Sequence, residues 1–180
     1  MTPAGAGSKL SLSDLNGFDQ AGFTAALGFA FEHSPWVVER AHAAAPFEGL
    51  EALCQATLAV LEAASPAERL ALIRAHPELA GKAAIARTLT AESLGEQASA
   101  GLDRLTPDEF ARFHQLNAAY AARFSFPFII CVRLNDKASI LAAMQRRLSN
   151  TAEEEIAEAI AQIGLISRLR LLDAVAACEL

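Results

Sequence analysis

One histidine of this chain stands where a helix must end, and an imidazole can give or take a proton near neutral pH. It is His76, within the stretch Leu72-Ile73-Arg74-Ala75-His76-Pro77-Glu78-Leu79-Ala80-Gly81. Pro77 disfavours the α conformation for the preceding residue, so we expect the helix to end at Ala75 and the imidazole to leave in an extended direction. The negative end of the helix dipole favours the charged imidazole, which suits a proton donor. The alternative to a catalytic role is that His76 is a surface histidine, or a core histidine whose ring nitrogens are hydrogen-bonded within the protein.

A short polar cluster follows this histidine in the sequence. Ser93 and Glu96 have the spacing of a capping box, so we expect a helix to begin at Ser93. The main-chain N–H groups at a helix start favour an anionic or carbonyl ligand, and Ser93 to Gln97 would supply donors. The alternative is that Ser93 and Glu96 only cap each other.

Arg170 places a positive charge on an apolar helix face. At about 100° per residue it shares an arc roughly 80° wide with Ile156, Ile160 and Ile163, whereas Arg168 points away. A buried guanidinium is costly unless it is paired, so Arg170 should meet a carboxylate, a helix end or an anionic ligand. Alternatively, its stem follows the edge of the apolar face and its charged end stays in water.

The elements that must position these residues are helices. Ser65-Pro66-Ala67-Glu68 and Thr106-Pro107-Asp108-Glu109 each combine a capping hydroxyl, a proline at the first helical position and a glutamate at the third. Other helical patterns cover residues 23–31, 34–41, 50–61, 135–149 and 152–177. We therefore predict an all-α fold of about seven to nine helices in a single compact domain over residues 13–180, after a flexible N-terminus at residues 1–12.

One stretch breaks the helical pattern. Phe124-Ser125-Phe126-Pro127-Phe128-Ile129-Ile130-Cys131-Val132-Arg133 is aromatic and β-branched around a proline that a helix interior does not tolerate. We expect it to be extended and buried. Its main-chain N–H and C=O groups must then bond to neighbours, water or a ligand, so a ligand platform is one solution.

Composition limits the classes of partner and compartment. The 180 residues are 53% hydrophobic, which suits one folded domain, and the net charge of −6 comes without a basic face, so no nucleic-acid partner is expected. Cys54, Cys131 and Cys178 lack Cys-x-x-Cys spacing, which argues against a disulfide framework or zinc site and favours a reducing, cytoplasmic location. We find no apolar signal segment in residues 1–9 and no apolar run long enough to span a bilayer, so no membrane partner is expected.

Four motifs in a fixed order carry a resemblance to a known family. They are Phe31-Glu32-His33-Ser34-Pro35-Trp36, the His-Pro stretch from Leu72 to Lys82, Ser93-x-x-Glu96-Gln97 before Ala100-Gly101-Leu102, and Phe126-Pro127-Phe128-Ile129-Ile130-Cys131-Val132-Arg133. Together they resemble the 2-oxo-4-hydroxy-4-carboxy-5-ureidoimidazoline (OHCU) decarboxylase family over about residues 20 to 175. Each motif is weak by itself, but their order and spacing are specific. Ser125 stands where glycine is expected, which could stiffen the bend without touching the chemistry.

The resemblance implies a cofactor-free, all-helical enzyme, usually a homodimer, that decarboxylates OHCU to (S)-allantoin in urate degradation. It implies that His76 is the catalytic acid/base beside Glu96, and that Pro77 contacts the substrate through its backbone. Further implied substrate contacts are Ser93, Glu96 and Gln97 as a polar wall, the main chain of Phe128, Ile129, Ile130, Cys131 and Val132, and Arg170 as a carboxylate or ureido clamp. Arg168 is the alternative clamp.

The residues are compatible with this chemistry. The imidazoline ring of the substrate can accept the electron pair, so neither a metal nor a Schiff base is required. The histidines lack metal-site spacing, since no His-Glu-x-x-His motif is present and His33 and His42 have no obvious third ligand. A carboxylate at Glu96 would favour a charged, proton-donating histidine.

The alternative function is a helical anion- or ureide-binding module without turnover, for which Glu96 would be no advantage. A hydrolase is disfavoured because neither a metal cluster nor a Ser-His-Asp order is visible.

Overall fold

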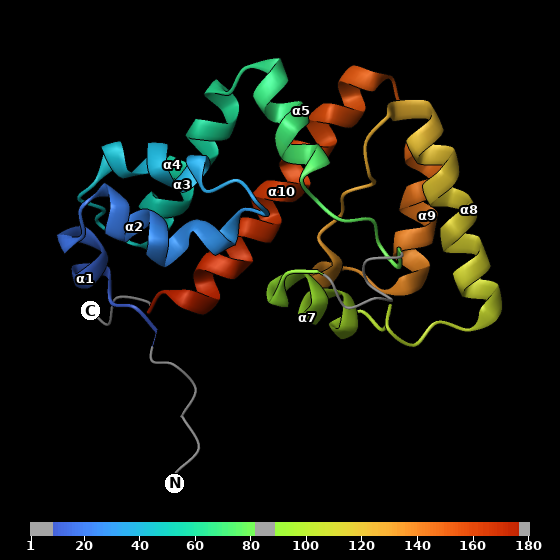
Figure 1. Cartoon of the computed structure of the whole chain (residues 1–180), viewed down its shortest axis with the longest axis horizontal. Coiled ribbons are helices and arrows are strands. Elements are labelled where there is room, and N and C mark those ends of the chain that lie inside the picture. The colour runs from blue at the N-terminus through green and yellow to red at the C-terminus, as the bar shows by residue number, and fades with distance from the viewer. Residues whose placement is uncertain (1–8, 82–88, 177–180) are drawn as a thin grey trace, which may run out of the picture. The chain divides into compact units, whose positions relative to one another are not determined.

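The structure is a computed structural model that describes residues 9–81 and 89–176 (Figure 1). These residues contain nine α-helices and no strand, which confirms the all-α prediction. They fall into two compact units, one built from the described parts of Met1–Phe31, Pro35–Ala63 and Ser167–Leu180, the other from Glu32–Ser34 and Ala64–Ile166. The single domain over residues 13–180 stays a prediction, and most of the expected flexible N-terminus lies outside the described residues.

Unit 1 is built around three successive helices. Its elements are α1 (Leu12–Gly17), α2 (Gln20–Leu27), α3 (Trp36–Ala41), α4 (Leu50–Ala63) and the last part of α10 (Ala152–Ala174). Ser11 and Asp19 cap the first two helices by accepting a main-chain N–H with their side chains. α3 packs against both α2 and α4, and Phe23, Val37 and Leu53 are fully buried.

The two ends of unit 1 meet in a short pairing of extended residues. Leu10 forms an isolated parallel bridge with Val175, through its N–H to the carbonyl of Ala174 at 2.9 Å and its carbonyl to the N–H of Ala176 at 2.9 Å. α10 ends at Ala174, earlier than the predicted Ala177. The N–H of Val175 still bonds to the carbonyl of Leu171, but the N–H of Ala176 bonds to Leu10 instead of continuing the helix. Ala177 itself lies outside the described residues.

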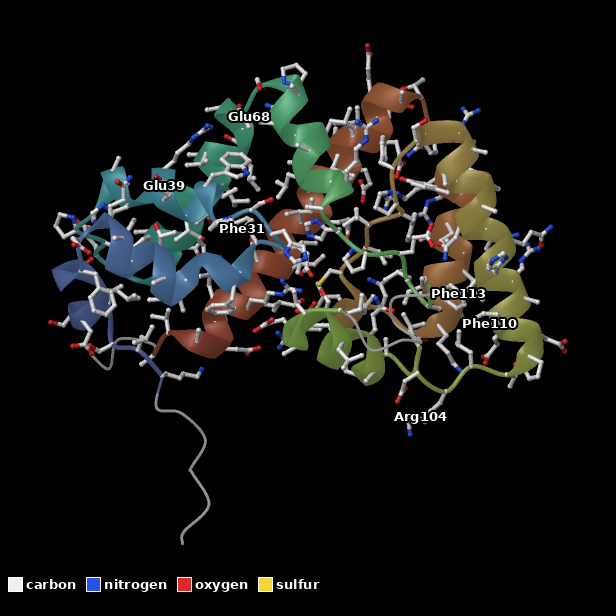
Figure 2. The ribbon with its side chains drawn as sticks, in the orientation of Figure 1. Phe31, Glu39, Glu68, Arg104, Phe110 and Phe113 are labelled. Carbon is white, nitrogen blue, oxygen red and sulfur yellow. The ribbon has the colours of Figure 1, made fainter. Side chains whose placement is uncertain are left out.

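Unit 2 contains the segments on which the candidate site depends. Its helices are α5 (Pro66–Arg74), α7 (Ala91–Ser99), α8 (Pro107–Phe124), α9 (Lys137–Arg147) and the first part of α10. α8 and α9 lie side by side (Figure 1). Figure 2 labels two phenylalanines of α8, of which Phe113 is fully buried and Phe110 is 38% exposed, as expected for an amphipathic helix. None of the described helices is both long and apolar enough to cross a membrane.

Both proline-containing capping boxes are confirmed. Ser65 accepts from the N–H of Glu68 while the Glu68 carboxylate accepts from the N–H of Ser65, and Thr106 and Glu109 repeat this arrangement. Glu68 is labelled at the start of α5 in Figure 2. These boxes set the directions in which α5 and α8 begin.

The helix start predicted at Ser93, from its capping-box spacing with Glu96, is wrong. α7 begins at Ala91 and not at Ser93, because the side chain of Thr90 caps it by accepting the N–H of Ser93. Ser93 is thus inside the first turn, and its hydroxyl bonds to Glu32 and not to its own helix. Neither the capping role assigned to Ser93 nor its alternative, a mutual cap with Glu96, describes this arrangement.

The stretch around Phe126-Pro127-Phe128 is extended and buried, as predicted. It links α8 to a short 3-10 helix, η3 (Val132–Leu134), and Phe128, Ile129, Ile130 and Cys131 are each no more than 7% exposed. Ser125 closes α8 in the left-handed conformation at φ 60°, the region that glycine adopts most easily. The glycine expected at this position is therefore replaced by a serine that adopts a glycine-like conformation.

Candidate active site

His76 lies directly after α5 and is buried, with 8% of its surface exposed. Its main-chain N–H bonds the carbonyl of Ile73, and its ring atom Nδ1 is 2.9 Å from the carbonyl oxygen of Leu72. The ring therefore turns back onto the last turn of α5, and the predicted extended direction is wrong, because the imidazole satisfies a carbonyl that the helix end leaves without an intrahelical donor.

This bond fixes the proton arrangement of the imidazole. A carbonyl oxygen only accepts, so Nδ1 must carry a hydrogen and donate it to Leu72. While the bond is kept, His76 can gain or lose a proton only at Nε2. A histidine held in this way presents one defined nitrogen for acid or base chemistry.

The loop after His76 is held by two buried amide side chains. Gln97 on α7 accepts from the N–H of Ala80 at 3.0 Å and donates to the carbonyl of Glu78 at 3.4 Å. Asn117 on α8 donates to the carbonyl of Leu79 at 2.8 Å. Ala80 adopts a left-handed conformation at φ 51°, which is strained for a residue other than glycine. Gln97 thus positions the His-Pro loop, and its implied contact to the substrate stays a prediction.

A buried carboxylate lies at the start of α7. Glu32 is 3% exposed and accepts from the hydroxyls of Thr90 and Ser93, each at 2.8 Å. The sequence favoured an anionic or carbonyl ligand at this helix start. A carboxylate of the protein itself lies there, so the positive end of the α7 dipole is already matched by a negative charge.

The main chain of the extended stretch is used largely within the protein. The carbonyl of Ile129 accepts from Arg147 at 2.7 Å, the N–H of Cys131 donates to the side chain of Gln162 at 2.9 Å, and the carbonyl of Cys131 accepts from Asn135 at 2.9 Å. The Arg147 guanidinium also lies 4.4 Å from the centre of the Phe128 ring. These bonds fix the course of the stretch, while its implied main-chain contacts to the substrate stay predictions.

Arg147 belongs to a buried charged network. Its guanidinium pairs with Glu155 on α10, Tyr120 on α8 donates to the same carboxylate, and Asn150 donates to it at 2.8 Å. Glu155 is fully buried and Arg147 is 3% exposed. Burial and the Glu155 carboxylate raise the pKa of Tyr120 well above its usual value. The network ties three helices of unit 2 to the extended stretch.

Glu96 is half-buried on α7, which packs against η3. Its charge acts on the buried thiol of Cys131, whose pKa is raised first by burial and then by the Glu96 carboxylate. Glu96 therefore lies near the end of the extended stretch. The pairing of Glu96 with His76 stays a prediction.

The two candidate arginine clamps belong to unit 1 and differ sharply in environment. Arg170 is 4% exposed and donates to the carbonyl of Phe29 at 3.3 Å. Arg168 is partly exposed and forms an ion pair with Glu51 at 2.6 Å. The predicted contrast between a buried Arg170 and an outward Arg168 is confirmed by these environments, and the assignment of the substrate clamp stays a prediction.

Within unit 2, two segments meet α7. The loop after His76 is bonded to Gln97, and the end of the extended stretch lies near Glu96. Sequence reasoning missed three contributors to this arrangement: Glu32, Asn117 and the Arg147–Glu155 pair. Glu32 stood inside a quoted motif without a role, and only its burial beside two hydroxyls reveals one. No group of three or more His, Cys, Asp or Glu side chains that could hold a metal ion occurs in residues 9–81 and 89–176.

Comparison with known proteins identifies the family. The OHCU decarboxylase family model matches residues 16–172. The chain is 38% identical to a 2-oxo-4-hydroxy-4-carboxy-5-ureidoimidazoline decarboxylase of Halalkalicoccus jeotgali, over 91% of this chain and 90% of that protein. It is also 38% identical to the protein of the same name in Haloferax volcanii, over 92% of this chain and 96% of that protein.

A solved structure agrees with these matches. The crystal structure of (S)-allantoin synthase superposes with a TM-score of 0.74 at 30% identity, covering 93% of this chain and 54% of that one. This chain thus spans about half the length of that protein. The match of the family model along most of the sequence, together with relatives that align almost from end to end, shows that the chain belongs to the OHCU decarboxylase family of carboxy-lyases.

Proposed function

We propose that this chain decarboxylates OHCU and delivers (S)-allantoin, with His76 as the acid/base and without a cofactor. The names of the curated relatives, and of the (S)-allantoin synthase whose fold it shares, support the substrate and the product. The observation that carries the role of His76 is the Nδ1 hydrogen bond to Leu72, because it leaves Nε2 as the one exchanging nitrogen in a buried position.

The reaction balances with groups of this chain and the substrate. The bond to the carboxylate breaks, carbon dioxide leaves, and the electron pair enters the imidazoline ring. His76 then delivers the Nε2 proton to one face of that ring and becomes neutral, and solvent returns the proton. Delivery from one fixed side would account for a single enantiomer.

The remaining assignments follow the family resemblance. Pro77, Ser93, Glu96, Gln97 and the main chain from Phe128 to Val132 line the substrate, and Arg170 holds its carboxylate or ureido group. We also propose a homodimer in the cytoplasm; the resemblance supports the dimer, and the widely spaced cysteines support the compartment.

Optical activity provides the test. Freshly generated OHCU is mixed with the protein, and the circular dichroism of the product is followed, since the uncatalysed reaction should give racemic allantoin. We expect a signal of the (S) enantiomer that grows faster than spontaneous decay and scales with protein concentration. Racemic product at the spontaneous rate would contradict the proposal. If calorimetry then showed that allantoin binds without turnover, the ureide-binding alternative would hold.

A further inference from the structure

Glu32 is a buried carboxylate to which the mechanism gives no role. It is 3% exposed, and its two oxygens each accept one hydroxyl at 2.8 Å, Oε1 from Thr90 and Oε2 from Ser93. A carboxylate accepts hydrogen bonds and donates none, so both hydroxyl hydrogens point at Glu32. Hydrogen bonds to a charged acceptor are stronger than bonds between neutral groups, and this carboxylate therefore determines how both hydroxyls are oriented.

The local backbone is strained at this position. His33, the next residue, has a left-handed conformation at φ 47°, and its side chain is 72% exposed. Strain of this kind persists only where the surroundings enforce it, and it often marks a functional position. Here it accompanies a chain reversal in which the side chain of Glu32 is buried, while the exposed His33 ring keeps its Nε2 4.0 Å from Oε1 of Glu32.

The orientation of the Ser93 hydroxyl has a chemical consequence. A serine hydroxyl has one hydrogen, and that of Ser93 is engaged by Glu32. Any further group that bonds to Ser93 Oγ must therefore donate a hydrogen to it. A carboxylate oxygen of a substrate cannot do so, and the nearby charge of Glu32 would also repel it. A ureido or ring N–H can.

We propose that Glu32 is a positioning residue that fixes Ser93 as a hydrogen-bond acceptor, so that this part of the site selects a substrate N–H and rejects a carboxylate. The inference rests on the proposed function, because it needs Ser93 to touch the substrate. It also sets an orientation: the leaving carboxylate of the substrate lies away from the start of α7.

A purely structural role for Glu32 makes a different prediction. As a negative charge at the start of α7, Glu32 would stabilise the helix dipole and leave ligand selectivity unchanged. Glu92, an acidic residue in the first turn of the same helix, is the matched control, since Glu92→Gln removes a negative charge there without touching Ser93.

A double-mutant cycle on (S)-allantoin binding separates the two roles. Glu32→Gln keeps the size but introduces an amide that donates, so one of the two hydroxyls must turn round. We expect affinity to fall by about five- to tenfold, the scale of one hydrogen bond, and to fall similarly in Ser93→Ala. The double variant should be no weaker than Ser93→Ala alone, and Glu92→Gln should bind like the wild type. An equal loss caused by Glu32→Gln in the Ser93→Ala background would overturn the inference.

A second measurement needs no change at Glu32 and covers the case in which Glu32→Gln does not fold. Wild type and Ser93→Ala are titrated with allantoin and with allantoins N-methylated at each N–H in turn. If Ser93 accepts, one N-methylated form loses affinity for the wild type but not for Ser93→Ala. Equal losses in both proteins for every form overturn the inference while leaving the proposed function intact. A wild-type protein that neither binds allantoin nor turns over OHCU overturns both.

Discussion

The side chain of Gln97 accepts a hydrogen bond of 3.0 Å from the main-chain N–H of Ala80, at the strained turn that follows His76. The same amide donates to the carbonyl of Glu78, so one buried side chain holds the loop on both sides of Leu79. The loop that presents the candidate acid/base is thus positioned by α7.

Replacing Gln97 by alanine should therefore cost both stability and turnover. It leaves a buried N–H without its partner, and we expect the free energy of unfolding to fall by about 1–3 kcal/mol, measured by urea denaturation. The catalytic rate should fall more than substrate affinity, because the loop carries His76. The control is Gln115→Ala on the exposed face of α8. Equal stabilities of the two variants would show that the loop does not depend on Gln97.

The raised pKa of Tyr120 should make the stability of the protein depend on alkaline pH. Burial and the Glu155 carboxylate raise the pKa of Tyr120 above its ordinary 10.0, so the folded protein holds the phenol proton more tightly than the unfolded chain does. This contribution is complete below about pH 10 and is lost as the pH rises above that value. Wild type should therefore lose unfolding free energy with pH more steeply than Tyr120→Phe.

The chain contains a single tyrosine, so near-ultraviolet absorbance reports its ionisation directly. We expect tyrosinate to appear only together with unfolding, as followed by far-ultraviolet circular dichroism. Ionisation at an ordinary pKa in the folded protein would contradict the buried network.

The Cys131 thiol reports the charge of Glu96. Burial and the Glu96 carboxylate raise the pKa of this thiol above 9.0, because a thiolate is disfavoured in an apolar place and beside a negative charge. In protein labelled with isotope-enriched cysteine, the Cβ chemical shift of Cys131 should titrate above pH 9. Glu96→Gln should move that titration to lower pH, and Glu92→Gln should not move it. An unchanged titration in Glu96→Gln would separate Glu96 from the extended stretch.

Arg170 and Arg168 provide a matched pair on one helix. If the buried Arg170 clamps the substrate through two donors, a lysine cannot reproduce the planar geometry, and Arg170→Lys should weaken allantoin binding by about tenfold or more. Arg168→Lys changes an exposed ion pair with Glu51 and should leave binding unchanged. Loss of affinity in the Arg168 variant alone would reverse the assignment.

Local signals predicted the helices well. In each capping box, at Ser65 and at Thr106, the two bonded residues are only three positions apart. Both partners are therefore visible in a short stretch of sequence. The extended stretch could be predicted equally well, because Pro127 and its β-branched neighbours are incompatible with a helix interior.

The errors at Ser93 and at the end of α10 arose where a distant partner decides. Ser93 has a capping sequence, but its hydroxyl bonds to Glu32, 61 residues earlier in the chain, and Thr90 caps the helix. Arg147 lies in the last turn of α9, where a positive charge suits the helix dipole, but its buried pairing with Glu155 depends on another helix. The pattern of one helix cannot reveal a partner on another.

The most direct test of the central claim is the optical activity of allantoin formed from OHCU by His76→Asn. Asparagine can still donate to the carbonyl of Leu72, so the variant should fold and bind allantoin like the wild type while lacking the titrating nitrogen. We predict that the rate of (S)-allantoin formation falls by about 10²–10⁴-fold, leaving mainly the racemic product of spontaneous decay. Formation of (S)-allantoin at nearly the wild-type rate would contradict the assignment of His76 as the catalytic acid/base.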